Sequence, residues 1–343
     1  MTRLRFSLLA LLGCLVLAGC RVAGEVPALV STAVVPSLEA TITPSLAAIP
    51  TDTAVATSPP ATAISETPPS PALTSTPPVP TASPTPEITP SPTPCGDPGR
   101  MEFGTVDSAI AGEPMRYRIY LPPCYGADGK TYPTLYMFGG NIHDDTIWDA
   151  LGLDEAASAA IASGDMAPLL IVMPDNGWLA NTTTSGSRSY EGFVLDELIP
   201  FIERTYCAWP NADGRAVGGL SRGGYWSLMM AFRRADLFRS AGAHSPALID
   251  SFAGPAEDPI ITGGTNELGD LRIWVDIGDR DPYLGDARPL HDTLSAAGVP
   301  HEWHVIEGTH DEAYWRANLA GYLSWYNGGW PAERSTLPDC ALN

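Results

Sequence analysis

Three side chains whose types together perform nucleophilic catalysis occur in order along the second half of the chain: Ser221, Asp281 and His310. A serine hydroxyl attacks a carbonyl carbon when a base removes its proton, and an imidazole oriented by a carboxylate is such a base. Ser221 also stands at the centre of a G-x-S-x-G motif. We therefore predict acyl-transfer chemistry on this serine, with no metal and no organic cofactor.

Steric crowding explains why the motif has glycine at both flanking positions. A short apolar run that begins at Ala216 precedes Ser221, and a helix is predicted over 225–233, which together make a strand, a sharp turn and a helix. The residues two before and two after such a serine pass too closely for a Cβ atom, and Gly219 and Gly223 meet that need. Because a Gly-rich turn can carry the same pattern by chance, the flanking elements must support the interpretation.

The acid of the predicted triad has several candidates. A strand predicted over 273–277 runs into an acidic loop. Asp281 lies a few residues past the strand end and has the reach to meet a histidine, so it is favoured. Asp279 is the main alternative, and Asp276 and Asp286 remain open.

The base is predicted to be His310, because it follows the next predicted strand, 302–306, in a polar loop. His304 lies inside that strand, where a structural role is expected. The other candidates lie near loops or helix starts without a partner pattern: His244, His291 and His301.

The elements predicted around these residues alternate between strands and helices. Strands are predicted near 101–107, 115–121, 134–138, 169–173, 217, 240–243, 273–277 and 302–306, and helices near 153–162, 192–206, 225–233, 290–297 and 312–326. Strands spaced by helices indicate an α/β domain with a mostly parallel sheet covered by helices on both faces. Sites in such sheets form where strands end and helices begin. The segment 177–190 is predicted to be a loop that borders the pocket.

Five motifs extend this pattern across most of the domain: Tyr120-Leu121-Pro122-Pro123, Tyr132-Pro133-Thr134-Leu135-Tyr136, Glu197-Leu198-Ile199-Pro200, Gly218-Gly219-Leu220-Ser221-Arg222-Gly223-Gly224 and Gly308-Thr309-His310-Asp311. Through them, residues 116–326 resemble the putative-esterase family of α/β-hydrolases, which includes esterase D-like, feruloyl and enterochelin esterases and the antigen 85 mycolyltransferases. The resemblance implies an α/β-hydrolase fold with Ser221 as nucleophile. The family's triad acid falls in a Gly-x-x-Asp run, which this chain matches at Asp281.

The chain departs from the family at the oxyanion loop, where many members carry His-Gly and this chain has Gly139-Gly140-Asn141. The hole uses backbone N–H groups, so the departure need not abolish it. Arg222 is the predicted first donor, and Gly140 or Asn141 is the second. His143 and Trp148 are candidate substrate contacts, although the loop that carries them can equally be a solvated rim.

The first 19 residues are predicted to be a signal peptide, with Arg3 and Arg5 ahead of an apolar stretch. The stretch ends in Leu-Ala-Gly-Cys20, which resembles the lipobox of bacterial lipoproteins and makes Cys20 the predicted lipidation site. Residues 25–94 hold 17 of the chain's 34 prolines and no aromatic residue. Such a composition cannot offset its ordering entropy, so 20–94 is predicted to be a disordered stalk and 95–343 an esterase domain.

The net charge of −20 argues against nucleic acid or an anionic membrane surface as partner. Membrane contact is expected only through the lipid anchor, at the bacterial cell surface. The four cysteines of the predicted domain suggest two disulfides in an exported protein. We expect Cys95–Cys340 to clamp the ends of the domain, which leaves Cys124–Cys207.

The function that the sequence favours is an extracytoplasmic serine esterase acting on acylated polysaccharides or siderophore esters. An acyltransferase to a sugar acceptor is the alternative within the same chemistry. A stalk-mounted binding module on an inactive hydrolase fold is the alternative of a different class.

Overall fold

A computed structural model describes residues 96–182, 185–249 and 254–342 of the chain. The signal peptide, the stalk and the lipidation site Cys20 lie outside these residues and stay predictions. In the described part of the chain, no helix is both long enough and apolar enough to cross a lipid bilayer.

Eight strands form one mixed sheet in the order β1-β2-β4-β3-β5-β6-β7-β8. They are β1 Arg100–Ser108, β2 Glu113–Leu121, β3 Thr134–Phe138, β4 Leu170–Pro174, β5 Arg215–Leu220, β6 Ser240–His244, β7 Arg272–Gly278 and β8 Glu302–Ile306. Strand β2 pairs antiparallel with β1 and with β4, and every pairing from β4 across to β8 is parallel. The predicted mostly parallel sheet is therefore confirmed.

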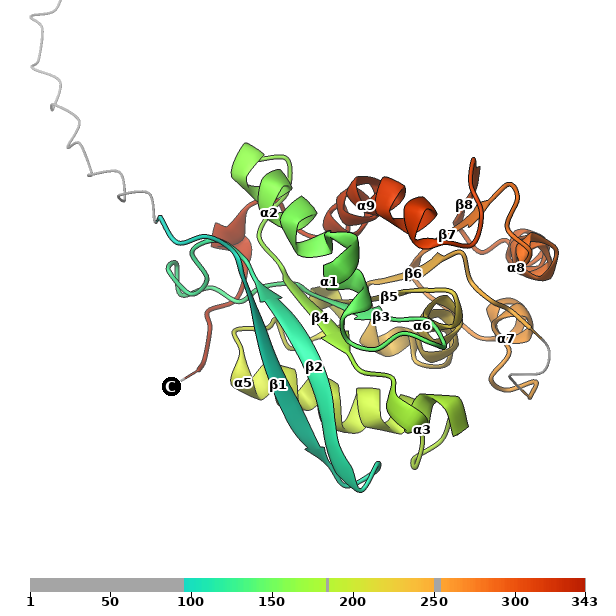
Figure 1. The fold of residues 1–343 in the computed structure, drawn as a ribbon, viewed down its shortest axis with the longest axis horizontal. Helices are drawn as coiled ribbons and strands as arrows, with labels where there is room; N and C mark the ends of the chain where they lie inside the picture. The colour runs from blue at the N-terminus through green and yellow to red at the C-terminus, as the bar shows by residue number, and fades with distance from the viewer. Residues whose placement is uncertain (1–95, 183–184, 250–253, 343) are drawn as a thin grey trace, which may run out of the picture. The chain divides into compact units, whose positions relative to one another are not determined.

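Helices cover both faces of this sheet (Figure 1). One face carries α1 Ile147–Leu151, α2 Leu153–Ser163 and α9 Glu312–Asn327. The other carries α5 Ile199–Thr205, α6 Arg222–Arg233, α7 Pro259–Thr265 and α8 Leu284–Ala296. Each face has its own apolar cluster, and the central strands β3 to β7 between them are largely buried.

Several helices differ from those predicted from the sequence. The helix predicted over 192–206 runs over 190–205 and contains a π-helical stretch, Phe193–Leu198. Helix α3, Gly177–Thr182, lies in the segment predicted to be a loop. Helix α8 begins well before residue 290, because burial of Leu290 and Leu294 overrides the low helix propensity of Gly285 and Pro289.

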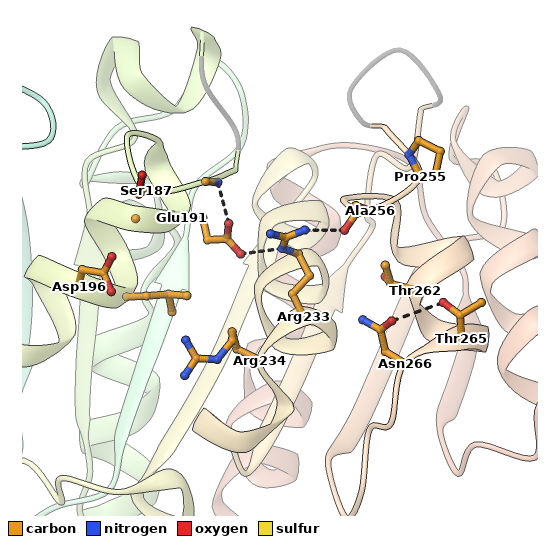
Figure 2. A pocket seen from close by; sticks show the side chains of 13 residues that line it. Ser187, Glu191, Asp196, Arg233, Arg234, Pro255, Ala256, Thr262, Thr265 and Asn266 are labelled. Carbon is orange, nitrogen blue, oxygen red and sulfur yellow. Dashed lines mark hydrogen bonds and ion pairs between the residues drawn. The ribbon is translucent and has the colours of Figure 1, made fainter.

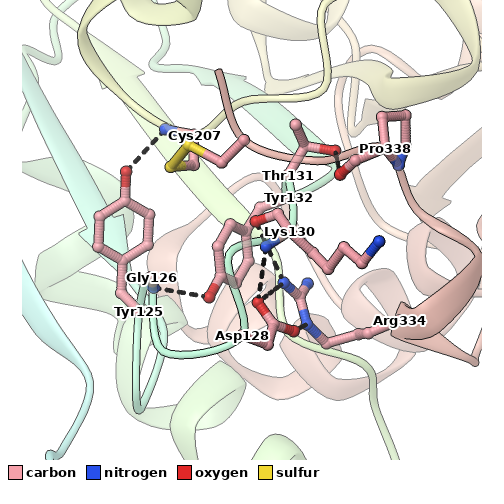
Figure 3. The surroundings of a disulfide bond; sticks show 10 residues. Tyr125, Gly126, Asp128, Lys130, Thr131, Tyr132, Cys207, Arg334 and Pro338 are labelled. Atoms are coloured by element: carbon pink, nitrogen blue, oxygen red, sulfur yellow. Dashed lines mark hydrogen bonds and ion pairs between the residues drawn. A yellow bond between two sulfur atoms is a disulfide. The ribbon is translucent and has the colours of Figure 1, made fainter. Parts of the chain in front are cut away.

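A disulfide joins Cys207 to Cys340, with Cα atoms 5.2 Å apart (Figure 3). The expected pairs Cys95–Cys340 and Cys124–Cys207 are therefore wrong, because each would need one cysteine of this bond. Cys124 is disulfide-bonded as well, and Cys95 lies outside the described residues.

The path of the C-terminal segment explains the pairing. After α9 the chain returns beside the segment that leads into β3, where the Thr131 N–H donates to the Pro338 carbonyl at 2.9 Å. On the same segment, the Tyr132 N–H donates to the Cys207 carbonyl at 2.7 Å. Both cysteines thus flank one short stretch at the amino-terminal edge of the parallel strands.

Candidate active site

Ser221 occupies the sharp turn between β5 and α6. Its backbone lies at φ +55° and ψ −121°, a region that residues other than glycine rarely adopt. A Cβ on Gly219 would lie 2.3 Å from the carbonyl carbon of Gly223, and one on Gly223 would lie 2.4 Å from the Phe138 carbonyl oxygen. The strand, turn and helix predicted for the motif are confirmed, and both glycines are sterically required.

Ser221, His310 and Asp281 form one hydrogen-bonded series, here called the row. Ser221 Oγ lies 2.9 Å from His310 Nε2, and His310 Nδ1 lies 2.9 Å from Asp281 Oδ2. The three side chains follow β5, β8 and β7, where the carboxyl ends of parallel strands meet. The structure thus brings together the three residues that the sequence singled out, at distances that allow proton transfer.

The surroundings of Asp281 keep it ionised. Burial raises the pKa of this carboxyl, but hydrogen bonds from His310, from the Ser245 hydroxyl and from the Tyr283 N–H at 2.8 Å outweigh burial. The pKa of Asp281 therefore lies below its ordinary value. An ionised carboxylate at this position can orient the imidazole and stabilise its charged form.

The other acidic candidates have different partners. Asp279 accepts a hydrogen bond from the Gly308 N–H at 2.9 Å, so it shapes the turn between β8 and α9. Asp276 is fully buried, and its Oδ1 lies 2.7 Å from His244 Nδ1. Asp286 is exposed in the first turn of α8. Of the four acids, Asp281 alone meets His310 in the structure.

The remaining histidine candidates lie away from the row. His304 stacks on the Trp274 ring at a centroid distance of 4.0 Å, in line with the structural role expected for it. His291 and His301 bond to each other, with 2.8 Å between Nδ1 and Nε2. In the described part of the chain, no group of three or more potential ligand side chains is arranged to hold a metal.

The loop after β3 lies directly against the nucleophile. A Cβ on Gly140 would be 3.2 Å from Ser221 Cβ. The Gly140 N–H donates to His143 Nδ1 at 3.2 Å, so it is engaged within the loop. Among the described residues, the Asn141 N–H donates no hydrogen bond, so this group can donate one to a ligand.

Asn176, which follows β4, fixes the shape of that loop. It is almost fully buried, and its Nδ2 donates to the Gly140 carbonyl at 2.9 Å and to the His143 carbonyl at 3.1 Å. The Tyr190 hydroxyl donates to Asn176 Oδ1 at 3.1 Å and sets the orientation of the amide. Sequence reasoning missed Asn176, because the run Pro-Asp-Asn-Gly predicts only a turn.

Arg222 contacts the loop after β3 through its side chain, in addition to placing its backbone N–H beside the nucleophile. It opens α6 immediately after the nucleophile, at the helix end where N–H groups favour negative charge. Its side chain donates to Asn141 Oδ1 at 3.1 Å. The predicted donor Arg222 and Asn141, one of the two candidates for the second donor, are therefore linked to each other.

The two predicted substrate contacts have different outcomes. Trp148 is fully buried, and its indole N–H donates to the Phe138 carbonyl at 3.0 Å, so the prediction that it touches substrate is wrong. His143 is half-buried, and its ring packs edge-on against Trp315, which packs against His310. Burial lowers the pKa of His143. His143 also lines a cleft of about 460 Å³, together with Asn141, Asp144, Thr146 and Glu312.

A larger hollow, of about 560 Å³, lies across the C-terminal end of α6 (Figure 2). Three of its charged side chains are paired: Glu191 accepts from Arg233 at 2.8 Å, and Arg234 donates to Asp236 at 2.9 Å. No member of the row lines it.

A mostly parallel sheet with a serine on its strand-to-helix elbow, helices on both faces and an acid and a histidine after later strands defines an α/β-hydrolase. Residues 108–326 match the family model described as "Putative esterase", and the chain belongs to this family.

Two relatives of known name are named as esterases. Esterase Rv1288 of Mycobacterium tuberculosis is 29% identical over 265 residues, which cover 62% of this chain and 56% of that protein. The chain thus spans about half the length of this relative. An endo-1,4-beta-xylanase/feruloyl esterase of Xylanibacter ruminicola is 29% identical over 240 residues, covering 64% of this chain and 30% of the relative.

Solved structures confirm the fold. A ferulic acid esterase superposes with a TM-score of 0.62 at 23% identity, covering 68% of this chain and 98% of that structure. An S-formylglutathione hydrolase from Staphylococcus aureus superposes with a TM-score of 0.58 at 19% identity, covering 66% and 98%.

Proposed function

We propose that this protein is a serine esterase that hydrolyses carboxylic esters through an acyl-enzyme on Ser221. The observation that carries the proposal is the row, in which His310 lies 2.9 Å from both the serine oxygen and the Asp281 carboxylate. Membership of the esterase family supports the reaction class. The strained turn at Ser221 supports its assignment as nucleophile, because such strain is concentrated at functional positions.

In the proposed mechanism, His310 Nε2 takes the hydroxyl proton as Ser221 Oγ attacks the ester carbonyl carbon. The backbone N–H groups of Arg222 and Asn141 stabilise the negative oxygen of the tetrahedral intermediate. The C–O bond to the leaving alcohol then breaks, and the proton on His310 passes to that alcohol. Water, activated by the same imidazole, hydrolyses the acyl-enzyme and restores the serine.

The substrate class that we propose is an ester outside the cytoplasm, carried by an acylated polysaccharide or a siderophore. The relatives named as a feruloyl esterase and as an iron(III) salmochelin esterase from Escherichia coli support these two kinds of ester. The location rests on the predicted lipidation of Cys20 and on the Pro-rich stalk. We assign the leaving alcohol to the cleft beside the oxyanion loop, which Asn141 and His143 line.

The test is hydrolysis of p-nitrophenyl acetate by the full chain. Ser221→Ala and His310→Ala are each expected to lower kcat by at least about a thousandfold, because the three groups act as one unit. A fluorophosphonate probe is expected to label the wild-type protein and not Ser221→Ala. An active Ser221→Ala variant would contradict the mechanism, and a wild-type protein that binds glycan without reacting with the probe would favour a binding module.

A further inference from the structure

Ser245, the residue directly after β6, contacts the row from a strand that supplies no other member of it. Its hydroxyl donates to Asp281 Oδ2, the same oxygen that faces His310 Nδ1. The residue is fully buried, so bulk water does not compete for this hydrogen bond. We propose that Ser245 is the fourth member of the row, a positioning residue that holds Asp281 against His310. The inference rests on the proposed esterase function and deepens it.

The backbone of Ser245 is the first observation behind the proposal. Its φ of +55° lies in the left-handed region, which non-glycine residues rarely adopt. Among the described residues only Ser221 and Cys124 share this feature, so two of the three strained positions meet at the row. Strain of this kind persists where the surroundings enforce it, and it is concentrated at functional sites.

Backbone hydrogen bonds enforce the strained turn and couple it to the nucleophile. The Ser245 N–H donates to the Asp276 carbonyl at 2.7 Å. On either side of it, the Ser221 N–H donates to the His244 carbonyl, and the Ala247 N–H donates to the Ser221 carbonyl, both at 3.1 Å. The segment that carries Ser245 is thus fastened to the nucleophile turn and to β7.

A buried polar cluster around the Asp276 carboxylate contacts this segment. The Asp276 carboxylate accepts hydrogen bonds from Trp274 Nε1 at 2.8 Å and from the hydroxyls of Tyr314 and Tyr322 at 2.7 and 2.8 Å. It also bonds His244, whose ring stacks on Tyr322 at a centroid distance of 3.7 Å. A buried network in which every member is satisfied is rigid. Ser245 is therefore presented to Asp281 from a fixed support.

The shared oxygen explains what the hydroxyl does. Asp281 Oδ2 has two donors, so the Ser245 hydroxyl withdraws part of the charge that this oxygen presents to His310. The bond also fixes the carboxylate in the rotamer that faces the imidazole. Without the hydroxyl, the Asp281 carboxylate would present more negative charge to the protonated imidazole and would stabilise it more strongly. The carboxylate would also lose the fixed orientation that rapid proton transfer needs. Besides Asp281 and Ser221, the groups packed around His310 are the rings of Tyr283 and Trp315, with His143 nearby.

The test compares two substitutions that both remove the hydroxyl, Ser245→Ala and Ser245→Gly. Glycine adopts a positive φ without strain. The two variants therefore differ in backbone strain at position 245, but both lose the hydrogen bond to Asp281. Both are expected to lower kcat for p-nitrophenyl acetate roughly tenfold with KM nearly unchanged. Both are also expected to move the acidic limb of the pH–rate profile upward by about half a pH unit.

Ser227→Ala is the matched control. Ser227 is also fully buried, but its hydroxyl donates to the Gly224 and Gly242 carbonyls and not to the row. This variant is expected to keep the acidic limb of the wild-type protein, even where its thermal stability falls. Circular dichroism at the assay temperature establishes that each variant is folded.

Two outcomes would overturn the role of Ser245. Wild-type kcat in both Ser245 variants would show that the hydrogen bond does not act on the reaction. A lower kcat with an unmoved acidic limb would show that the residue is merely structural. Failure of the proposed function would be seen separately, as a wild-type protein that neither turns over ester nor reacts with the fluorophosphonate probe.

Discussion

Asp281 and Asp279 are two positions apart in one loop, yet only Asp281 meets the imidazole. Asp281→Asn keeps the size of the side chain and removes the charge that orients His310, so kcat for p-nitrophenyl acetate is expected to fall roughly a thousandfold or more. Because hydrogen bonds keep the pKa of Asp281 below its ordinary value, the wild-type carboxylate stays ionised in mild acid and is protonated only as the pH falls through that lowered pKa.

Asp279→Asn is the control for this prediction, because it makes the same chemical change on a partly exposed side chain. It is expected to keep kcat within about threefold of the wild-type value, as surface changes usually have small effects. The defect of Asp281→Asn should also persist from pH 5 to 8, where the wild-type carboxylate is charged. Equal losses in the two variants would show that the acid has been wrongly assigned.

Residues of the site could be predicted from the sequence where their place depends only on chain order or on backbone sterics. The order of Ser221, Asp281 and His310 and the glycines of the elbow are properties of the chain itself. Trp148 was not predictable, because its burial depends on how α1 packs under β3. The role of Ser245 was equally hidden, since it depends on a side-chain hydrogen bond between two loops that are distant in sequence.

The loop after β3 depends on the end of β4 for its shape, which makes the coupling of two elements testable. Asn176→Ala removes the amide that binds the Gly140 and His143 carbonyls, so the Asn141 N–H should lose its fixed position. We expect kcat to fall between about tenfold and a thousandfold with a smaller change in KM, as for the loss of an oxyanion donor. Steady-state kinetics with p-nitrophenyl acetate measure both quantities.

Asn181→Ala is matched to this change in residue type and neighbourhood. The exposed Asn181 amide reaches the Asn141 carbonyl only at 3.5 Å, so its removal should alter kcat by less than about twofold. A loss in Asn181→Ala as large as that in Asn176→Ala would mean that general loosening of the region, and not the buried amide, controls the loop.

The bounds of β3 and β8 could be predicted from the sequence and agree with the structure, because each is a five-residue segment bounded by proline and glycine residues. Helices were less predictable where glycine or proline interrupts the pattern. In α8, burial against the sheet sustains a helix that local propensity does not favour. In α3, six residues suffice for a helix, too few for hydrophobic periodicity to be recognised.

In the described domain, the row and the Cys207–Cys340 disulfide lie at opposite edges of one sheet. The row follows the carboxyl ends of the parallel strands, whereas the Cys207–Cys340 bond lies beside the chain that enters β3 (Figure 3). The pairing was not predictable from the cysteine order, because it depends on the return of the segment after α9 along residues 129–132. We therefore expect that breaking this disulfide changes stability without changing activity.

The disulfide closes a loop whose ends are 133 residues apart, so breaking it should mainly favour the unfolded chain. Cys207→Ser and Cys340→Ser are each expected to lower the free energy of unfolding by about 2–5 kcal/mol in urea titrations, with kcat of the folded protein unchanged. Because both substitutions break the same bond, the double variant should lose no more than either single variant. Additive losses would mean that the two cysteines belong to different bonds, and a fall in kcat would mean that the clamp also shapes the row.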